Sequence, residues 1–276
     1  MKKIVFSVIA CVLLISTEAQ LKTPAPSPGQ IIKQDFGIGT IELSYSRPGI
    51  KGRKIFGDLV PYGKVWRTGA NNATTLNFSD EVIIGGQTIP AGKYGFLTIP
   101  DKDNWTLIIT KSVDVTSPSD YKQENDVVRV KVKPLKIDET TETFTMQFAN
   151  IKPASCDLLV RWDHTVVALP IKNELEKKVM AQIDDLMKND NRPYYQAAMY
   201  YMDNGKDLNQ ALAWFDKAIE QNPKAFWVYH QKANALAKLG KKSDAKTTAQ
   251  KSIELAKEAK NLDYVILNEK LIADLN

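Results

Sequence analysis

Six basic side chains and one tryptophan lie within a single stretch punctuated by glycine, residues 47–75. An arginine guanidinium presents a planar fork of N–H donors that matches a carboxylate, phosphate or sulfate, so several arginines in one loop system can form an anion clamp. Trp66 can supply a stacking surface, and Asn71 can supply amide donors and acceptors. The residue types therefore predict a site for an anionic small molecule, glycan or peptide terminus.

A structural interpretation of the same stretch stays open. Arginine stems cover apolar surface, Trp66 and Phe56 can fill a core, and glycines permit turns. Clustered charges occur at functional sites and in structural networks alike. Residue chemistry alone does not decide between the two interpretations.

The positive charge is concentrated in this stretch. The chain of 276 residues has a net charge of +5, and residues 47–67 alone carry six basic residues against Asp58. The segment 1–19 contributes a further +1, so the rest of the chain is slightly acidic. A nucleic-acid-binding surface spreads Lys and Arg along a face or a tail. We therefore expect no nucleic-acid partner.

The segment 1–19 resembles a secretory signal peptide. Lys2 and Lys3 precede an apolar run over residues 4–15, and small residues lead to Ala19. The run is shorter than the roughly 20 residues of a membrane-spanning helix. We expect cleavage near Gln20, a periplasmic or secreted protein, and no transmembrane anchor after cleavage. A lipoprotein signal ending at Cys11 is the alternative, although the apolar VLLIS that follows Cys11 argues against it.

The sequence predicts an α+β multidomain protein. Residues 20–31 form a Pro-rich linker that we expect not to pack. Residues 32–172 show the period of two that is typical of half-buried strands, with a Gly85-Gly86 hairpin turn, and predict an antiparallel β-sandwich or barrel. The stretch 112–126 is a long loop of the kind that is either disordered or functional.

The period becomes helical after residue 172. A bridging helix is expected over 173–191, and helices at 193–204, 208–221, 224–239, 243–259 and 262–275 follow. Ala211, Phe215, Ala218 and Pro223 have the spacing of a tetratricopeptide repeat, and the next repeat, which starts this pattern again at Ala245, is a weaker second copy. Residues 192–276 thus resemble tetratricopeptide repeats.

This resemblance implies a protein or peptide partner. The concave face of such repeats is lined by the first helix of each pair, which here contributes Gln196, Tyr200, Asp203, Trp227, His230, Asn234 and Lys238. Such grooves bind extended peptides. The alternative is that Tyr200 and Trp227 only pack between the helices.

Catalytic motifs are absent from the sequence. It contains no H-E-x-x-H, G-x-S-x-G, P-loop or G-x-G-x-x-G, and with two histidines it predicts no metal site and no cofactor. His164 is expected in a turn between strands, without an identifiable nucleophile. The acidic residues Asp138, Glu139 and Glu142 are expected in a solvated loop.

A family signature occupies the basic stretch. The segment YSRPGIKGRKIFGDLVPYGKVWRTGANNATTLNF, followed by AGKYGFLTIPDKDNW, resembles exported bacterial proteins catalogued as domain of unknown function 2911. The resemblance spans residues 32–172 and implies an exported β domain, often followed by tetratricopeptide-like helices, with no established activity. It singles out as candidate ligand residues Arg47, Lys51, Arg53, Trp66, Arg67, Asn71, Lys93 and Tyr94.

Three functional classes follow from these observations. The first is a non-catalytic binding protein, with an anion site in the β domain and a protein-docking surface on the repeats. The second is an enzyme for an anionic substrate, in which arginines stabilise developing charge and Tyr94, Lys93 or His164 acts as base. The third is a scaffold. The lack of a nucleophile and base pair favours the first class over the second.

Overall fold

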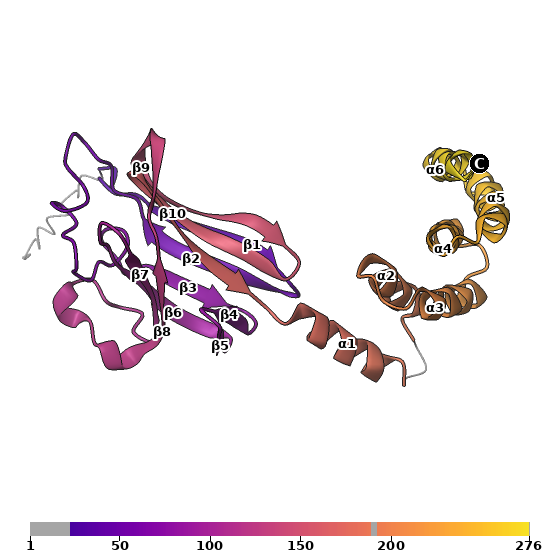
Figure 1. Cartoon of the computed structure of the whole chain (residues 1–276), viewed down its shortest axis with the longest axis horizontal. Coiled ribbons are helices and arrows are strands. Elements are labelled where there is room, and N and C mark those ends of the chain that lie inside the picture. The colour runs from indigo at the N-terminus through magenta and orange to yellow at the C-terminus, as the bar shows by residue number, and fades with distance from the viewer. Residues whose placement is uncertain (1–22, 189–191, 276) are drawn as a thin grey trace, which may run out of the picture. The chain divides into compact units, whose positions relative to one another are not determined.

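The computed structural model describes residues 23–188 and 192–275, and the chain divides between Asn173 and Glu174 into two compact units. The first unit is built of antiparallel sheets and the second of helices (Figure 1). The predicted α+β architecture is therefore confirmed. The predicted signal segment and the first residues of the linker lie outside the described residues.

Six strands form the larger sheet of the β unit, in the order β1-β2-β3-β6-β7-β8. They are β1 (Gly29–Phe36), β2 (Gly39–Ser46), β3 (Thr75–Phe78), β6 (Gly92–Ile99), β7 (Trp105–Thr110) and β8 (Asp126–Val132). The smaller sheet has the order β5-β4-β10-β9. Its strands are β4 (Val82–Ile84), β5 (Gln87–Ile89), β9 (Leu135–Lys152) and β10 (Ser155–Lys172). Two separate sheets make the domain a sandwich rather than a closed barrel.

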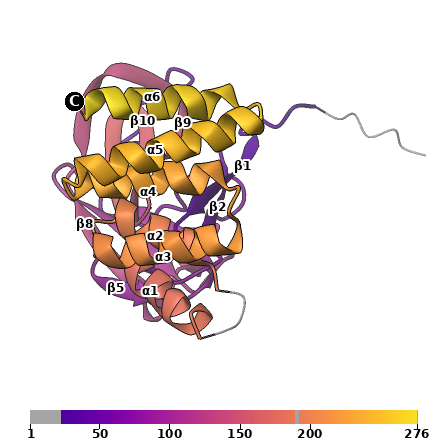
Figure 2. The same ribbon diagram turned by 90° about the vertical axis from the view of Figure 1, so that its right-hand side faces the viewer.

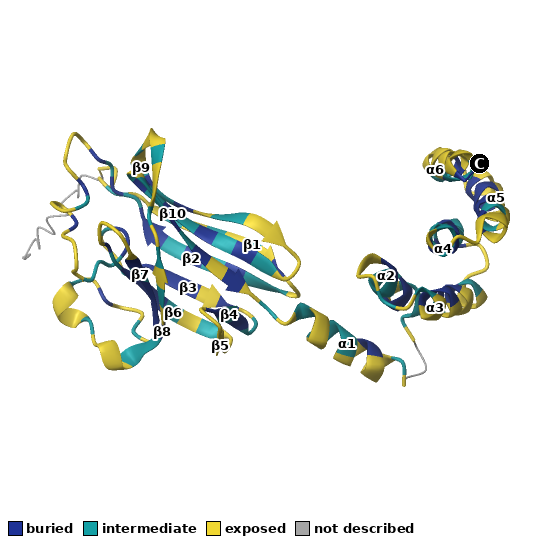
Figure 3. Cartoon of the chain, in the orientation of Figure 1, coloured by how far each residue is buried: buried dark blue, intermediate teal, exposed yellow. Residues whose placement is uncertain are grey.

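The core lies between the inner faces of the two sheets. Ile41, Leu43 and Tyr45 of β2 are buried at alternate positions, as the period of two predicts (Figure 3). An aromatic cluster fills one part of this core, in which edge-to-face and stacked contacts join Phe56, Trp66, Trp105, Phe144 and Trp162. Burial of such a ring contributes about 1.5–3 kcal/mol to folding. Two of these rings, Phe56 and Trp66, come from the basic stretch.

The turns follow local sequence chemistry. Gly85 and Gly86 connect β4 to β5 with φ angles of 60° and 80°, which glycine adopts without steric cost. The segment PDKDN joins β6 to β7, as its turn residues predict. The long loop before β8 holds two short 3₁₀ turns, η1 (Pro118–Asp120) and η2 (Gln123–Asn125).

Three predictions about this unit are wrong. The linker is shorter than predicted because residues 29–31 belong to β1, and the carbonyl oxygens of Ser27 and Pro28 accept hydrogen bonds from the Asn71 side chain and the Arg47 backbone. The acidic residues at 138, 139 and 142 lie on β9 rather than in a loop, because β9 pairs with β10 along most of its length. His164 lies within β10, beside a bulge at which Asp163 has a φ of 53°.

The helical unit contains α1 (Leu175–Leu186), α2 (Tyr194–Asp203), α3 (Leu208–Gln221), α4 (Phe226–Lys238), α5 (Lys242–Glu258) and α6 (Leu262–Asp274). From α2 onward, each helix packs on the next one along the chain (Figure 2). The predicted ends of these five helices agree closely with the observed ones. Ala211 and Ala245, at the same position of successive repeats, are both fully buried, because small side chains let neighbouring helices approach closely.

Candidate ligand site

Arg47, which directly follows β2 of the larger sheet, connects this sheet to β9 of the smaller sheet by side-chain hydrogen bonds. Its Nε donates to the carbonyl oxygen of Phe144 at 3.1 Å, and its Nη2 donates to Oγ1 of Thr145 at 2.8 Å. The backbone beside it also pairs with β9, since the Phe144 N–H donates to the carbonyl oxygen of Pro48. The loop that carries Arg47 therefore covers the free edge of β9, and its guanidinium is engaged by the protein.

Arg53 and Lys51 stabilise the same loop. Arg53 donates from Nε to the Ile50 carbonyl oxygen and from Nη2 to that of Gly49, at 3.0 and 2.6 Å. Lys51 has a φ of 49°, and its backbone N–H donates to the carboxylate of Glu142. The first half of the basic stretch thus makes hydrogen bonds within the fold, in agreement with the structural interpretation.

The second half is organised around Trp66. Its backbone forms an isolated antiparallel bridge with Thr98 of β6, and its indole Nε1 donates to the Gly69 carbonyl oxygen at 3.1 Å. The indole ring stacks on Trp162, with ring centroids 5.7 Å apart and planes inclined by 16°. The predicted stacking surface for a ligand is therefore largely occupied by the core.

A strained turn follows Trp66. Thr68 is fully buried and has a φ of 55°, which is a rare conformation for a β-branched residue. Its hydroxyl lies 3.1 Å from Oγ1 of Thr98, and its carbonyl oxygen accepts from Thr74. Strain of this kind persists only where the surroundings determine the conformation, and it is common at functional sites. Arg67 lies between this buried turn and the half-buried indole, so its backbone position is fixed.

Arg67 lines a cavity of about 370 Å³. One wall comes from residues 59–67 and the other from residues 116–118. The polar lining consists of Lys64, Arg67, Thr116 and Ser117, and the remaining lining residues are Leu59, Val60, Pro61, Val65, Trp66 and Pro118. The guanidinium of Arg67 donates one hydrogen bond to the Thr116 carbonyl oxygen and so connects the two walls.

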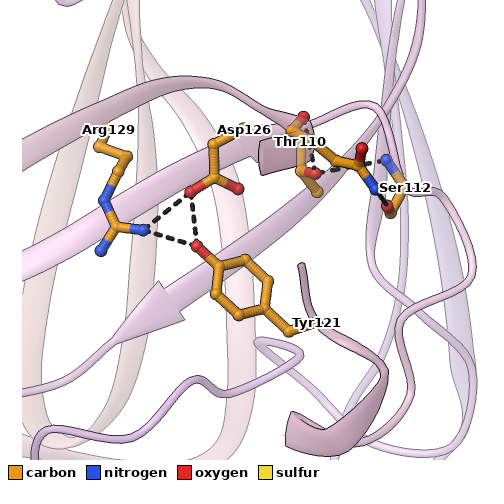
Figure 4. Close-up of polar contacts among 6 residues, drawn as sticks. Thr110, Ser112, Tyr121, Asp126 and Arg129 are labelled. Atoms are coloured by element: carbon orange, nitrogen blue, oxygen red, sulfur yellow. Dashed lines mark hydrogen bonds and ion pairs between the residues drawn. The ribbon is translucent and has the colours of Figure 1, made fainter. Parts of the chain in front are cut away.

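The far wall is held in place by a polar cluster (Figure 4). The Tyr121 hydroxyl donates to Oδ2 of Asp126 at 2.5 Å, and Nη1 of Arg129 donates to both groups. Burial and the neighbouring Asp126 carboxylate raise the pKa of Tyr121 to about 12, so the hydroxyl stays protonated at neutral pH. Val115, which belongs to the same loop as this wall, is buried against Leu97 of β6 and Ile108 of β7. The segment 112–126 is therefore ordered along this wall.

Within residues 23–188 and 192–275, two cations at the cavity have no anionic partner. In the described part of the chain, no ion pair joins Lys64 or Arg67 to a carboxylate. In the β unit, ion pairs join Arg129 to Asp126 and Arg161 to Glu139. Unpaired positive charge beside an apolar wall is the arrangement that an anionic ligand with an apolar part would complete.

The other predicted ligand residues lie elsewhere. Asn71 donates to the carbonyl oxygen of Ser27 and holds the segment before β1. Lys93 and Tyr94 lie at the start of β6, where the Tyr94 hydroxyl donates to the Pro90 carbonyl oxygen. Of the eight predicted residues, the structure thus places Trp66 and Arg67 at the cavity. The predicted clamp of several arginines is not formed, because each arginine has a different backbone partner.

The candidate catalytic groups also lie away from the cavity. Nε2 of His164 is 3.2 Å from Oγ1 of Thr140, and its Nδ1 is 3.1 Å from the Ile137 carbonyl oxygen. These residues lie on the exposed part of the β9-β10 ribbon and line none of the cavities described here. Burial raises the pKa of the Cys156 thiol to about 11, as expected for a core residue. Within residues 23–188 and 192–275, no group of three metal-ligating side chains is found.

The structure of the helical unit alters the set of residues that can line the predicted peptide groove. His230 is buried, with Nδ1 2.9 Å from Oδ1 of Asn268 and Nε2 3.1 Å from the amide of Asn234. Trp227 packs edge-to-face on Phe226. His230 is therefore a core residue, whereas Trp227 is half-buried and packs against the core. The predicted positions that stay wholly or partly accessible are Gln196, Tyr200, Asp203, Trp227, Asn234 and Lys238.

The comparisons with known proteins address both units. A family model described as protein of unknown function (DUF2911) matches residues 27–171, more than half of the chain. The chain belongs to this family. The DUF2911 domain is followed by two tetratricopeptide-repeat matches, over residues 192–224 and 214–247. No curated protein and no solved structure matches the chain.

The family signature has a structural explanation in this DUF2911 domain. The R-P-G element closes the edge of β9, and W-R-T-G forms the strained turn that carries Arg67. Sequence reasoning missed Lys64, Leu59 and the wall at 116–118 as ligand residues. The available signal for that wall was the length of the 112–126 loop.

No helix in the described residues has the length and apolar character needed to cross a membrane.

Proposed function

We propose that this protein is a non-catalytic binding protein whose β unit holds an anionic small molecule, glycan or peptide terminus in the cavity at Arg67. The observation that carries the proposal is that Lys64 and Arg67, which form no ion pair with the residues that the structure describes, line one cavity of about 370 Å³ with an apolar wall. This volume is at the lower end of the range of about 300–1,000 Å³ for small-molecule sites. A compact ligand fits these dimensions.

The repeats supply the second half of the proposed function. Tetratricopeptide repeats are protein-interaction elements, so the helical unit is proposed to bind a protein partner. The accessible positions of α2 and α4, among them Gln196 and Asp203, are the proposed contact surface. We further propose that the protein is exported, on the basis of the signal-like residues 1–19.

The geometry favours binding over catalysis. A general base must come within about 3 Å of the proton that it removes. The candidate bases Lys93, Tyr94 and His164 do not line the Arg67 cavity. A purely structural role explains Arg47, Arg53 and the bond from Arg67 to Thr116, but it gives no use for the remaining donors of Arg67 or for the ammonium of Lys64.

A thermal-shift screen tests the proposal. The purified protein is heated with a panel of anionic metabolites and charged glycans, because a ligand of the native state raises the unfolding temperature. At least one anion should stabilise the wild type, and Arg67→Ala should reduce that shift. If no anion stabilises the wild type, or if Arg67→Ala responds equally, the cavity is not an anion site.

A further inference from the structure

The charges around the Arg67 cavity limit the charge of its occupant. The cavity lining provides the two cations Lys64 and Arg67. The carboxylate of Asp120 lies directly behind one wall, where its Oδ2 accepts hydrogen bonds from the Ser117 N–H at 3.0 Å and from the Thr116 hydroxyl. The local balance of these three groups is one positive charge. A monoanion neutralises this balance, whereas a dianion would also be repelled by Asp120.

Few hydrogen-bond donors are free at the cavity. The N–H groups of Ser117, Ser119, Asp120 and Tyr121 all have acceptors within their own loop. The Ser117 hydroxyl is hydrogen-bonded to that of Ser119, and the Thr116 hydroxyl to Asp120. Protein sites for phosphate usually provide several backbone N–H groups from a helix N-terminus or a nest. The loop 117–121 has no such set to offer.

The remaining donors suit a carboxylate. A guanidinium has five N–H donors, and Arg67 gives one bond to the Thr116 carbonyl oxygen. In the part of the chain that the structure describes, the Lys64 ammonium makes no hydrogen bond that would compete. The guanidinium fork and one ammonium can together saturate the two oxygens of a carboxylate.

The apolar wall requires an apolar part in the ligand. Leu59 is 44% exposed although it lines the cavity, and Pro61 and Pro118 are exposed beside it. Covering such a side chain contributes about 25 cal/mol for each Å² of apolar surface removed from water. An inorganic anion or a sugar phosphate would leave this surface in water.

We infer that the occupant is an amphipathic monocarboxylate, with its carboxylate on Lys64 and Arg67 and a compact apolar or aromatic body against Leu59, Pro61 and Pro118. This inference rests on the proposed anion-binding function of the cavity and names the class of ligand. It separates the site from phosphate, sulfate and sugar-phosphate sites, which the same arginine chemistry would also suit.

Isothermal titration calorimetry of the full chain with two probes, phenylacetate and inorganic phosphate, measures their affinities and tests the inference. Phenylacetate should bind measurably, and phosphate should bind at least about tenfold more weakly, because phosphate covers no apolar surface and its second charge is repelled by Asp120. Arg67→Gln should weaken phenylacetate about tenfold or more, which corresponds to about one lost charged hydrogen bond. Leu59→Ser, at an exposed position, should weaken it several-fold by removing apolar contact. Lys33→Gln removes one exposed positive charge from β1 and should leave the affinity unchanged.

The outcomes separate the two levels of the claim. Phosphate that binds as tightly as phenylacetate and depends on Arg67 would overturn the inferred class and keep the anion site. Phenylacetate binding that is unaffected by Leu59→Ser would also overturn the inferred class, because the apolar body would lie elsewhere. The failure of phenylacetate, phosphate and the anion panel together would overturn the proposed function and this inference with it.

Discussion

The guanidinium of Arg67 donates a hydrogen bond to the carbonyl oxygen of Thr116, far along the chain in the 112–126 loop. This bond connects the two loops that face each other across the cavity. It uses one donor and leaves the rest of the fork available. Arg67 therefore both joins the walls and presents charge to the cavity. By contrast, Arg47 donates its hydrogen bonds to the edge strand β9, and Arg53 donates its hydrogen bonds within its own loop.

Arg47→Ala should destabilise the protein without changing ligand binding. The half-buried guanidinium makes two hydrogen bonds to β9, and their loss should lower the free energy of unfolding by about 1–3 kcal/mol. Lys54→Ala, at an exposed position of the same stretch, is the matched control and should change stability little. Urea denaturation followed by tryptophan fluorescence measures both. Equal stabilities of the two variants would contradict the conclusion that the hydrogen bonds of Arg47 to β9 stabilise the fold.

Gly69→Ala should destabilise the turn that carries Arg67. A Cβ at this position would lie 2.9 Å from the Ser46 carbonyl oxygen, and the φ of 147° is strained for alanine. Strain of about 1–3 kcal/mol and a similar cost of overpacking are expected. At Gly63, where φ is 71° and nothing lies within 4 Å, alanine should cost only about 1–2 kcal/mol. A larger loss for Gly63→Ala, measured by chemical denaturation, would contradict this account of the turn.

The raised pKa of the Tyr121 hydroxyl predicts that the free energy of unfolding falls at alkaline pH. Its pKa is raised from 10.0 to about 12 in the folded protein, by burial and then by Asp126. The folded state therefore holds the proton more tightly, and the resulting stabilisation is present below about pH 10 and lost as the pH rises towards 12. Unfolding curves of the wild type and Tyr121→Phe should differ most below about pH 10 and converge towards about pH 12. A difference that is independent of pH would show that Tyr121 does not titrate as described.

Asn268 should be a stability determinant of the helical unit. Its fully buried amide contacts His230 Nδ1, the Ser252 hydroxyl and the Tyr264 carbonyl oxygen at 2.9, 2.9 and 2.6 Å. Asn268→Ala leaves His230 and Ser252 without this partner and should cost about 2–4 kcal/mol. Asn209→Ala, on the exposed face of α3, is the control. Thermal unfolding followed by circular dichroism should give a lower midpoint for Asn268→Ala alone, and equal midpoints would refute the role of this network.

Local features of the fold could be predicted from the sequence. The Gly85-Gly86 turn depends on backbone conformations that glycine provides by itself, and the helix ends depend on a repeat that recurs within one segment. Alternation along β2 identified its buried side chains because the period of two depends on the strand alone. These features require no knowledge of which distant segments meet.

The composition of the site could not be predicted in the same way. Arg47 donates hydrogen bonds to β9, which lies far along the chain, and Lys64 lines the same cavity as residues 116–118, whose sequence has no periodic pattern. The density of charge in residues 47–67 drew attention to the stretch that contributes Lys64 and Arg67 to the cavity. It did not reveal which guanidiniums the fold itself uses, because that depends on long-range pairing.

A monocarboxylate on Lys64 and Arg67 would lie in the cavity that Trp66 also lines, so the indole N–H signals in the nitrogen-15 NMR spectrum test its binding most directly. The chain has five tryptophans, of which Trp66 lines the cavity while Trp214 and Trp227 belong to the helical unit. Titration with phenylacetate should shift the Trp66 signal progressively and leave those of Trp214 and Trp227 in place, and Arg67→Gln should need about tenfold more phenylacetate for the same shift. An unmoved Trp66 signal at saturating phenylacetate, or equal shifts of all five signals, would contradict the account.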